Sequence, residues 1–306
     1  LTGFRDGGSL KPPFDGLNSQ VQVSGKGLDG YQALLRSLDE TETVSDNDLA
    51  RAAEELDLDQ LTDYFLYNIW AGNRDWPSHN YFIYRDRAGD KKWRWMPWDA
   101  DFTFNYPWGL WTRDTLGRLT VSDTWEWGLY DIFNKPKHGC YMLHRLMTNE
   151  GFRETFLTRL CDLMNSRLSP ENVVEQIESV AATNYEEKMR DMEFWKIAPM
   201  NFETRKQQLI RFAQNRRSAI EAQMQDRFDK GEFHKVEVSN PSGETIRLNS
   251  LDIAEPIWSG TYYEGCQIRL NSEGSIRRWK IGDQIFDQSS VEFPLAGATR
   301  IEALTD

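Results

Sequence analysis

The chain has 306 residues, of which 39% are hydrophobic and 27% are charged, as is typical of a globular protein with one large or two ordinary domains. Its net charge of -12 argues against sequence-independent binding to nucleic acid, because such binding depends on Lys and Arg side chains that neutralise phosphates. No apolar run approaches the roughly 18 residues that a membrane span needs, so we expect no membrane-spanning segment.

The first 28 residues are rich in Gly, Pro, Asp and Ser and show no sustained period, which predicts irregular structure laid over another surface. The segment from Leu1 to Gly8 has no start Met, no basic region and no apolar region. It therefore resembles neither a native start nor a signal peptide, and we expect the chain to be an excised or processed piece.

Helical spacing of apolar residues begins at Gly30. Ser45 is a predicted N-cap for a second, short helix, and a third helix is expected over residues 58–71, with Gly72 at its end. The predicted buried face of the third helix consists of Leu61, Tyr64, Phe65 and Ile69.

A change of pattern follows. Residues 80–85 (NYFIYR) are rich in strand-forming side chains, residues 86–90 (DRAGD) are typical of a turn, and residues 92–98 (KWRWMPW) alternate charged or polar with large apolar side chains. These features predict a β-hairpin.

Helical patterns then return, and Ser169 with Pro170 marks a strong helix start. The expected helices cover residues 125–133, 141–147, 152–168, 170–183 and 202–228. Beyond Phe233 the pattern is that of short strands separated by Gly-containing turns. The chain should therefore be divided into a helical part with a hairpin, residues 1–232, and a small all-β domain, residues 233–306.

Candidate chemistry gathers between residues 73 and 101. Asp75 is followed five residues later by Asn80, and Asp99 and Asp101 come just after the hairpin. A hairpin brings its two ends together, so these side chains could converge on one metal-bound triphosphate. Protein kinases use the same order: one Asp accepts the proton of the substrate hydroxyl, and an Asn and a later Asp hold Mg²⁺. Two carboxylates and an amide oxygen suit Mg²⁺ or Mn²⁺ better than zinc.

Simpler explanations of the same residues stay open. Asp75 and Asn80 could cap a helix or a turn, and Asp99 and Asp101 could be surface acids. Paired carboxylates also serve glycosidases, and Trp side chains would then form sugar platforms. The Trp residues in question are Trp70, Trp76, Trp93, Trp95, Trp98, Trp108 and Trp111. The three cysteines, at positions 140, 161 and 266, are spaced too widely for a zinc site. We expect them to be small buried side chains, and a single disulfide between two of them is the alternative.

The fuller string is more specific than any of its parts. It consists of Asn73, Asp75, Asn80, Tyr81, Tyr84, Trp93, Pro97-Trp98-Asp99, Asp101 and Phe104. This string resembles the signature of the CotH kinase family, and the resemblance extends over residues 28–230. It implies that Asp75 is the catalytic aspartate and that Asn80 and Asp99 bind the metal, with Asp101 either a second ligand or a support for the first. Separately, residues 260–281 resemble the repeat-type β modules of bacterial surface proteins.

The switch from helical to alternating periodicity and back predicts an α+β fold with a small all-β C-terminal domain, and the CotH resemblance implies that its mostly helical part is like the C-lobe of an atypical kinase. The resemblance also implies transfer of the γ-phosphoryl group of ATP to Ser or Thr with Mg²⁺ or Mn²⁺. The small lobe with its glycine-rich loop and lysine is expected to be missing, because fewer than about 30 residues precede the helical part in this sequence. The one upstream glycine run, Ser24-Gly25-Lys26-Gly27, fits neither a Walker A loop nor a kinase loop. This chain alone should then show little activity.

The acidic charge favours a Ser-rich, basic protein substrate. An extracellular or cell-surface location is expected, with a spore-coat or cytoplasmic setting as alternatives. The competing function is that of a non-catalytic, glycan-binding surface protein, a pseudokinase.

Overall fold

The protein is an α+β protein, as predicted. The structure, a computed structural model, describes residues 2–5, 22–24, 28–39, 42–74, 76, 80, 82–85, 89–104, 109–117, 140–198 and 200–304. Several predictions fall outside these residues: the catalytic role of Asp75, the glycine run at 25–27, the helix over 125–133, and the roles of Tyr81 in the family string and of Trp108 as a sugar platform. By its internal contacts the chain divides into two compact units, Leu1–Arg153 and Glu154–Asp306, and the two are described separately.

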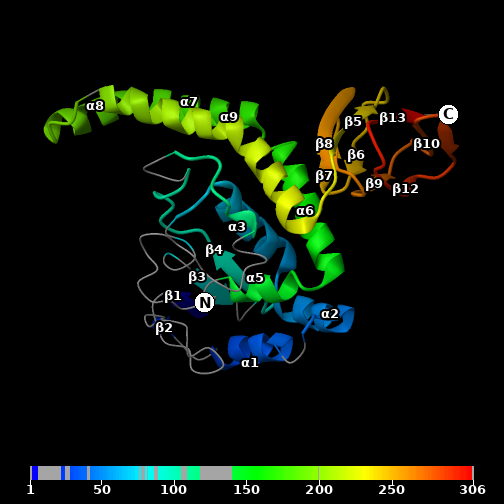
Figure 1. Ribbon diagram of the computed structural model, residues 1–306, viewed down its shortest axis with the longest axis horizontal. Helices are drawn as coiled ribbons and strands as arrows, with labels where there is room; N and C mark the ends of the chain where they lie inside the picture. The colour runs from blue at the N-terminus through cyan, green and yellow to red at the C-terminus, as the bar shows by residue number, and fades with distance from the viewer. Residues whose placement is uncertain are drawn as a thin grey trace. The chain divides into compact units, whose positions relative to one another are not determined.

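Three helices open the first unit: α1 (Leu28–Asp39), α2 (Asp46–Glu55) and α3 (Leu58–Trp70) (Figure 1). Ser45 caps α2 as predicted, in a capping box in which its side chain accepts from the backbone N–H of Asp48 at 3.2 Å. Such a cap contributes about 1 kcal/mol. The predicted inner face of α3 is buried in full. The last described helix that lies wholly within this unit is α5 (Tyr141–Leu146).

The predicted hairpin is present as β3 (Phe82–Arg85) and β4 (Trp93–Met96), which pair antiparallel with Ile83 opposite Trp95. It belongs to a four-stranded sheet in the order β2-β1-β3-β4. The strands β1 (Thr2–Arg5) and β2 (Gln22–Ser24) show that the irregular structure predicted for residues 1–28 is wrong at these positions, and residues 6–21 and 25–27 lie outside the described residues. Both are too short to show a period of their own, and β1 is specified by its pairing with β3, far along the chain.

Aromatic rings fill the core beneath the hairpin. Trp93 and Trp95 alternate inward from β4 and are almost wholly buried. The Tyr31 ring of α1 meets Trp93 edge-on at 5.4 Å between centroids, and Phe65 of α3 lies 6.1 Å from Trp95. Edge-on pairs of this kind add about 0.5–1.5 kcal/mol each to the area that they bury. The hairpin is thus packed firmly against α1 and α3.

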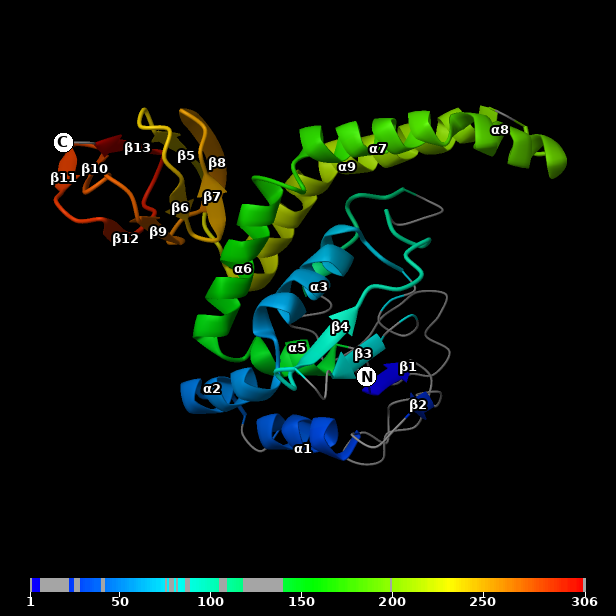
Figure 2. The same ribbon diagram turned by 180° about the vertical axis from the view of Figure 1, so that it is seen from behind.

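The second unit begins within α6 (Glu150–Met164) and continues with α7 (Pro170–Thr183), α8 (Tyr185–Phe194) and α9 (Met200–Phe228) (Figure 2). Ser169 caps α7 with Pro170 in its first turn, as predicted. The helix α8 was not predicted, because only Met192 of its side chains is buried and it therefore has no apolar period. Across the described residues, none of the helices combines the length and the apolarity that crossing a bilayer requires.

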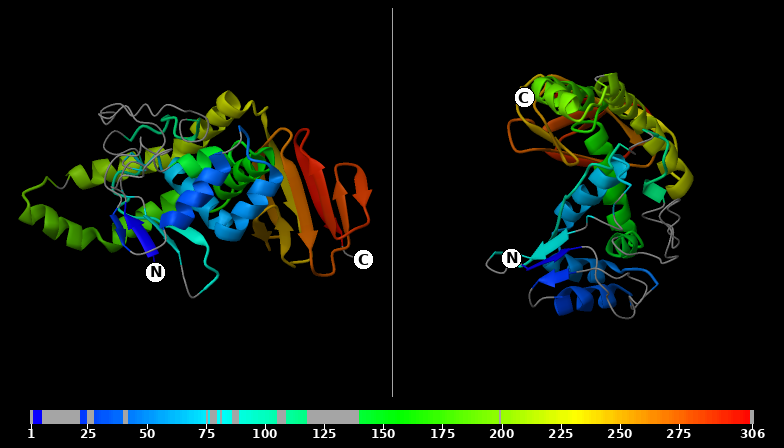
Figure 3. Two further views of the ribbon diagram at one scale, coloured as in Figure 1. Left: turned by 90° about the horizontal axis from the view of Figure 1, so that it is seen from below. Right: turned by 90° about the vertical axis from the view of Figure 1, so that its left-hand side faces the viewer.

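The remaining strands form two sheets, in agreement with the predicted all-β segment (Figure 3). The five-stranded sheet has the order β11-β10-β13-β5-β8 and the four-stranded sheet the order β12-β9-β6-β7. Their bounds are β5 (Phe233–Ser239), β6 (Ile246–Leu248), β7 (Leu251–Ile253), β8 (Ile257–Tyr263), β9 (Gln267–Ser272), β10 (Arg278–Ile281), β11 (Gln284–Phe286), β12 (Ser290–Pro294) and β13 (Thr299–Leu304). The change from helix to strand occurs where it was predicted, but the domain division at residues 232–233 stays a prediction.

Polar side chains join α6 to β8 within the second unit. Asp162, almost fully buried, accepts hydrogen bonds from the Tyr262 hydroxyl at 2.7 Å and from the backbone N–H and the hydroxyl of Ser250. Burial raises the pKa of Asp162 above 3.8, although the donors from Ser250 and Tyr262 oppose this shift. Because one carboxylate satisfies three donors, we infer that it fixes β8 on the helix.

Asn165 forms a second hydrogen-bonded contact with β8, which is an edge strand. Its amide donates to the Thr261 carbonyl at 3.1 Å and accepts from the Thr261 N–H at 2.9 Å. Close approach requires glycine beside it, since a Cβ at Gly260 would lie 2.7 Å from the Asn165 Nδ2. The side-chain amide of Asn165, in the turn just after α6, thus takes the place of a neighbouring strand.

Candidate functional site

The loop that leads to the predicted catalytic segment is built on the end of α3. The helix ends at Trp70, and Gly72 adopts a positive φ of 59°, which glycine tolerates without a steric cost. Asn73 is then held by Asn68, which accepts from both the backbone N–H of Asn73 at 3.1 Å and its side-chain amide at 2.9 Å. The Asn68 amide in turn donates to the Tyr64 carbonyl. All three are buried, so the loop starts from a fixed point.

Two backbone hydrogen bonds join this loop to the segment that follows β4. The Arg74 N–H donates to the Phe102 carbonyl at 3.1 Å, and the Phe104 N–H donates to the Ala71 carbonyl at 2.6 Å. The chain directly before position 75 therefore lies against the chain directly after Asp101. The structure therefore joins the segment that leads to position 75 with the segment that follows Asp101.

Asp75, the predicted catalytic residue, lies outside the described residues. Its neighbours Arg74 and Trp76 are both buried. The Trp76 indole donates to the Tyr64 hydroxyl at 2.6 Å, and its ring meets that of Phe65 at 5.2 Å. Both residues that flank position 75 are thus anchored on α3 and on the loop after β4.

The predicted metal ligands Asn80 and Asp99 lie at one end of the hairpin. Phe82 pairs with Met96 as the last described pair of β3 and β4, and its ring meets Trp98 at 5.5 Å, which continues the contact past the paired strands. Asn80 has a φ of 57° and Asp99 a φ of 48°, in the left-handed region that non-glycine residues seldom adopt. Such residues cost about 1 kcal/mol or more and gather at functional sites.

The donor set fits a hard divalent cation. Asn80 is half-buried, whereas Asp99 and Asp101 are exposed, so their oxygens are accessible. Amide and carboxylate oxygens are the ligands that Mg²⁺ and Mn²⁺ prefer, with water and phosphate oxygens completing the shell. Among the described residues there is no group of three or more His, Cys, Asp and Glu side chains that could hold a metal ion. The fit therefore rests on the amide of Asn80 together with the two carboxylates.

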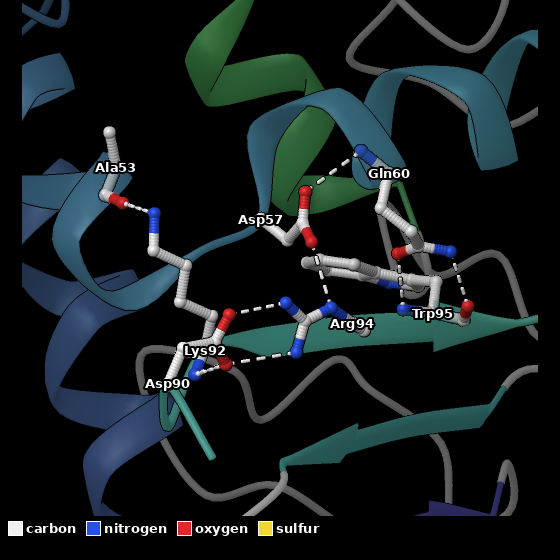
Figure 4. Close-up of polar contacts among 7 residues, drawn as sticks. All are labelled: Ala53, Asp57, Gln60, Asp90, Lys92, Arg94 and Trp95. Carbon is white, nitrogen blue, oxygen red and sulfur yellow. Dashed lines mark hydrogen bonds and ion pairs between the residues drawn. The ribbon is translucent and has the colours of Figure 1, made fainter.

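The edge strand β4 is held by side chains from the start of α3 (Figure 4). The amide of Gln60 donates to the Trp95 carbonyl at 2.6 Å and accepts from the Trp95 N–H at 2.8 Å, as a neighbouring strand would. The Asp57 N–H also donates to the Trp93 carbonyl at 3.1 Å. Gln60 is thus fixed to the strand four residues before Asp99.

Charged groups complete this attachment of β4 (Figure 4). Arg94 donates to Asp57 at 2.7 Å and forms a two-pronged ion pair with Asp90 in the hairpin turn. The hydrogen bonds from Arg94 lower the pKa of Asp90 to about 2. The Lys92 ammonium donates to the Ala53 carbonyl at 2.6 Å near the end of α2.

None of Gln60, Asp57 and Arg94 stood out in the sequence. The one available signal was their placement, since Asp57 and Gln60 begin a helix and Arg94 lies on the polar side of an alternating strand. Of the seven tryptophans that could have formed sugar platforms, Trp70, Trp76, Trp93 and Trp95 are buried and cannot stack on a sugar. Trp98 is exposed and Trp111 is half-buried, and Trp108 lies outside the described residues. All three cysteines are buried and free, as expected for small core side chains.

Comparison with known proteins supplies the family. The family model described as CotH kinase protein matches residues 17–220, which include α1 to α8, the hairpin and most of α9. None of the curated proteins compared with the chain matches it. The likeness of residues 260–281 to bacterial surface modules stays a prediction, since the match ends before the first strand of that segment.

Proposed function

Because the chain belongs to the CotH kinase protein family, we propose that it takes part in transfer of the γ-phosphoryl group of ATP to a Ser or Thr hydroxyl of a protein. The family supports a kinase-like protein, and the chemistry of the site supports the finer assignment. In that reaction the hydroxyl oxygen bonds to the γ-phosphorus, the bond from phosphorus to the β–γ bridging oxygen breaks, and ADP leaves.

Asp75 accepts the proton of the attacking hydroxyl and orients that hydroxyl toward the phosphorus. Asn80 and Asp99 hold Mg²⁺ or Mn²⁺, and Asp101 is a second ligand or supports Asp99. A divalent ion bound there would neutralise charge on the phosphate oxygens. The protein's own contribution is to keep these oxygens fixed before the nucleotide arrives, since fixed donors need no rearrangement during the reaction.

One observation carries the proposal: the paired hydrogen bonds between the loop after α3 and the loop after β4. The Arg74–Phe102 and Phe104–Ala71 bonds join the segments on which Asp75 and Asp101 stand. The hairpin brings Asn80 to the same end as Asp99. We propose that the proton acceptor and the metal ligands converge at this place, as phosphoryl transfer requires.

The substrate that suits this protein is basic and rich in Ser, because a net charge of -12 attracts Lys and Arg side chains by simple complementarity. We further propose that the protein works outside the cell or at its surface, on the likeness of residues 260–281 to surface modules. To test this location, the tagged protein is expressed in its native host and the cells are fractionated. We expect to find the protein in the medium or at the cell surface.

Calorimetric titration of Mn²⁺ with ATP tests the metal assignment. We expect the wild type to bind the Mn²⁺–ATP complex and Asp99→Ala to bind it at least about tenfold more weakly, since one of few carboxylate ligands is lost. Asp283→Ala, which removes an equally exposed carboxylate from the turn between β10 and β11, is the matched control and should leave the isotherm unchanged. Identical isotherms for the wild type and Asp99→Ala would remove Asp99 from the site.

A further inference from the structure

The outer face of the hairpin formed by β3 and β4 carries exposed apolar side chains. Trp93 and Trp95 of β4 point into the core, so the alternate residues of the strand point outward. Met96 is one of these and leaves 45% of its surface exposed, and Trp98, two residues further on, leaves 53% exposed. The hairpin therefore presents large apolar side chains on the side that does not face the core.

Phe82 of β3 joins Met96 and Trp98 into one patch. Phe82, which is half-buried, lies directly opposite Met96 in the register of the two strands. Side chains of directly opposite residues project from the same face of a sheet and touch one another. The Phe82 ring also meets the Trp98 ring edge-on at 5.5 Å between centroids. These two contacts link the three side chains, which together form the apolar platform.

The strands that carry the apolar platform are held in place from the core side. Trp95, directly before Met96, makes both of its backbone hydrogen bonds to the Gln60 side chain, at 2.6 and 2.8 Å. Ile83, directly after Phe82, is buried opposite Trp95. Because the backbone on both strands is fixed, the platform loses little conformational freedom when a ligand binds to it.

The apolar platform ends directly beside the candidate metal site. Trp98 precedes Asp99, so their Cα atoms are about 3.8 Å apart. In the proposed reaction an ion at Asp99 holds phosphate oxygens, and the substrate hydroxyl must reach the γ-phosphorus. A residue next to the accepting Ser is also one peptide unit away from it, so its side chain is within reach of the platform. The nucleotide base, in contrast, is separated from the γ-phosphate by the ribose and two further phosphates.

We propose that the apolar platform binds a large apolar side chain, such as Leu, that stands next to the Ser or Thr to be phosphorylated. This inference rests on the proposed phosphoryl transfer and adds a specificity determinant to it. A Leu side chain that packs on Trp98 and Met96 removes apolar surface of both partners from water, whereas Ala offers little area for such a contact. The protein should therefore prefer sites with Leu beside the accepting Ser over sites with Ala there.

Fluorescence anisotropy with labelled synthetic peptides tests the platform by binding alone. In the Leu peptide, Leu stands on both sides of a single Ser and Lys residues flank this core; the Ala peptide replaces both Leu with Ala and keeps the same charge. With Mn²⁺ and ADP present, we expect the wild type to bind the Leu peptide about tenfold more tightly than the Ala peptide. In Trp98→Ala this preference should disappear, because the two changes remove the same contact.

Two further variants show whether the loss of preference is specific. Trp98→Leu keeps apolar surface at this position and should keep part of the preference for the Leu peptide. Trp195→Ala removes a Trp side chain that is 66% exposed just after α8, in the second unit, and should keep all of that preference. Unchanged circular dichroism will show that each variant is folded.

Transfer of radiolabelled phosphate to the same peptides separates this inference from the proposed function. The wild-type kcat/KM should favour the Leu peptide, and Trp98→Ala should show the same kcat/KM for both peptides. A Trp98-dependent preference in binding without transfer to either peptide would support the platform and contradict the proposed function. Transfer by the wild type with equal kcat/KM for the two peptides would support the proposed function and overturn the platform.

Several binding results would also overturn the proposal. These are equal affinity of the wild type for the two peptides, binding of neither peptide, and a preference for the Leu peptide that Trp98→Ala retains. Weaker binding of Mn²⁺ and ADP to Trp98→Ala in the absence of peptide would assign the platform to the nucleotide instead. Binding of chitohexaose or cellohexaose that Trp98→Ala abolishes would assign it to a glycan.

Discussion

Gln60 offers a sharp test of how the hairpin is positioned. Its side chain makes both backbone hydrogen bonds to Trp95, at 2.6 and 2.8 Å, in a half-buried position. Two such bonds contribute about 1–3 kcal/mol together. The higher helix propensity of alanine raises the free energy of unfolding by only a few tenths of a kcal/mol. Gln60→Ala should therefore destabilise the first unit by about 1–2.5 kcal/mol.

Hydrogen exchange shows which residues lose protection when Gln60 is replaced. In Gln60→Ala the Trp95 amide should exchange faster, and so should the amides of residues 98–101, because the strand that leads to Asp99 has lost its outer partner. Asn165→Ala is the matched control: it removes the same two-bond attachment from Thr261 in the second unit and should speed exchange there alone.

Gln60→Glu separates hydrogen bonding from side-chain size. It keeps the acceptor for the Trp95 N–H but replaces the donor with a carboxylate that faces the Trp95 carbonyl. Protonation restores a donor, so the pKa of the new carboxyl should lie above its ordinary value. The destabilisation should be present at neutral pH and shrink as pH falls through that raised pKa. Unchanged exchange at Trp95 in both Gln60 variants would refute the reasoning.

Three further outcomes are expected elsewhere. Asp162→Ala should destabilise the second unit by about 3 kcal/mol in urea unfolding, since it leaves the buried Tyr262 hydroxyl and the half-buried donors of Ser250 without their acceptor. Because burial raises the pKa of Asp162 above 3.8, the stability of the wild type relative to Asp162→Asn should be greatest below pH 3.8 and fall as pH rises through the raised pKa. Burial raises the pKa of Cys266 to about 11, so maleimide at pH 7 should label it only after unfolding; labelling at the rate of a free thiol would contradict its placement.

Local pattern was enough to predict the elements that carry their own signals. The buried face of α3 follows from apolar spacing, the start of α2 from Ser45, and the start of α7 from Ser169 with Pro170. The hairpin followed from alternation in β4, whose Trp93 and Trp95 point inward as expected.

Elements that depend on distant partners could not be predicted in this way. The strand β1 exists through its register with β3, in which Phe4 lies opposite Ile83. The attachment of Trp95 by Gln60 likewise depends on a contact between residues 35 positions apart. The catalytic assignment of Asp75 came from the family motif, whereas the surroundings of position 75 are visible only through the bonds of Arg74 and Trp76.

Transfer of radiolabelled γ-phosphate tests the central claim most directly. The protein, produced with any residues that flank this sequence, is incubated with ATP, Mn²⁺ and a Ser-rich basic peptide. We predict incorporation into Ser that falls by about 10²–10⁴ in Asp75→Asn, as loss of a general base implies. It should be unchanged in Asp283→Asn, which alters an exposed acid far along the chain. Undiminished transfer by Asp75→Asn, or no transfer by the wild type, would contradict the account.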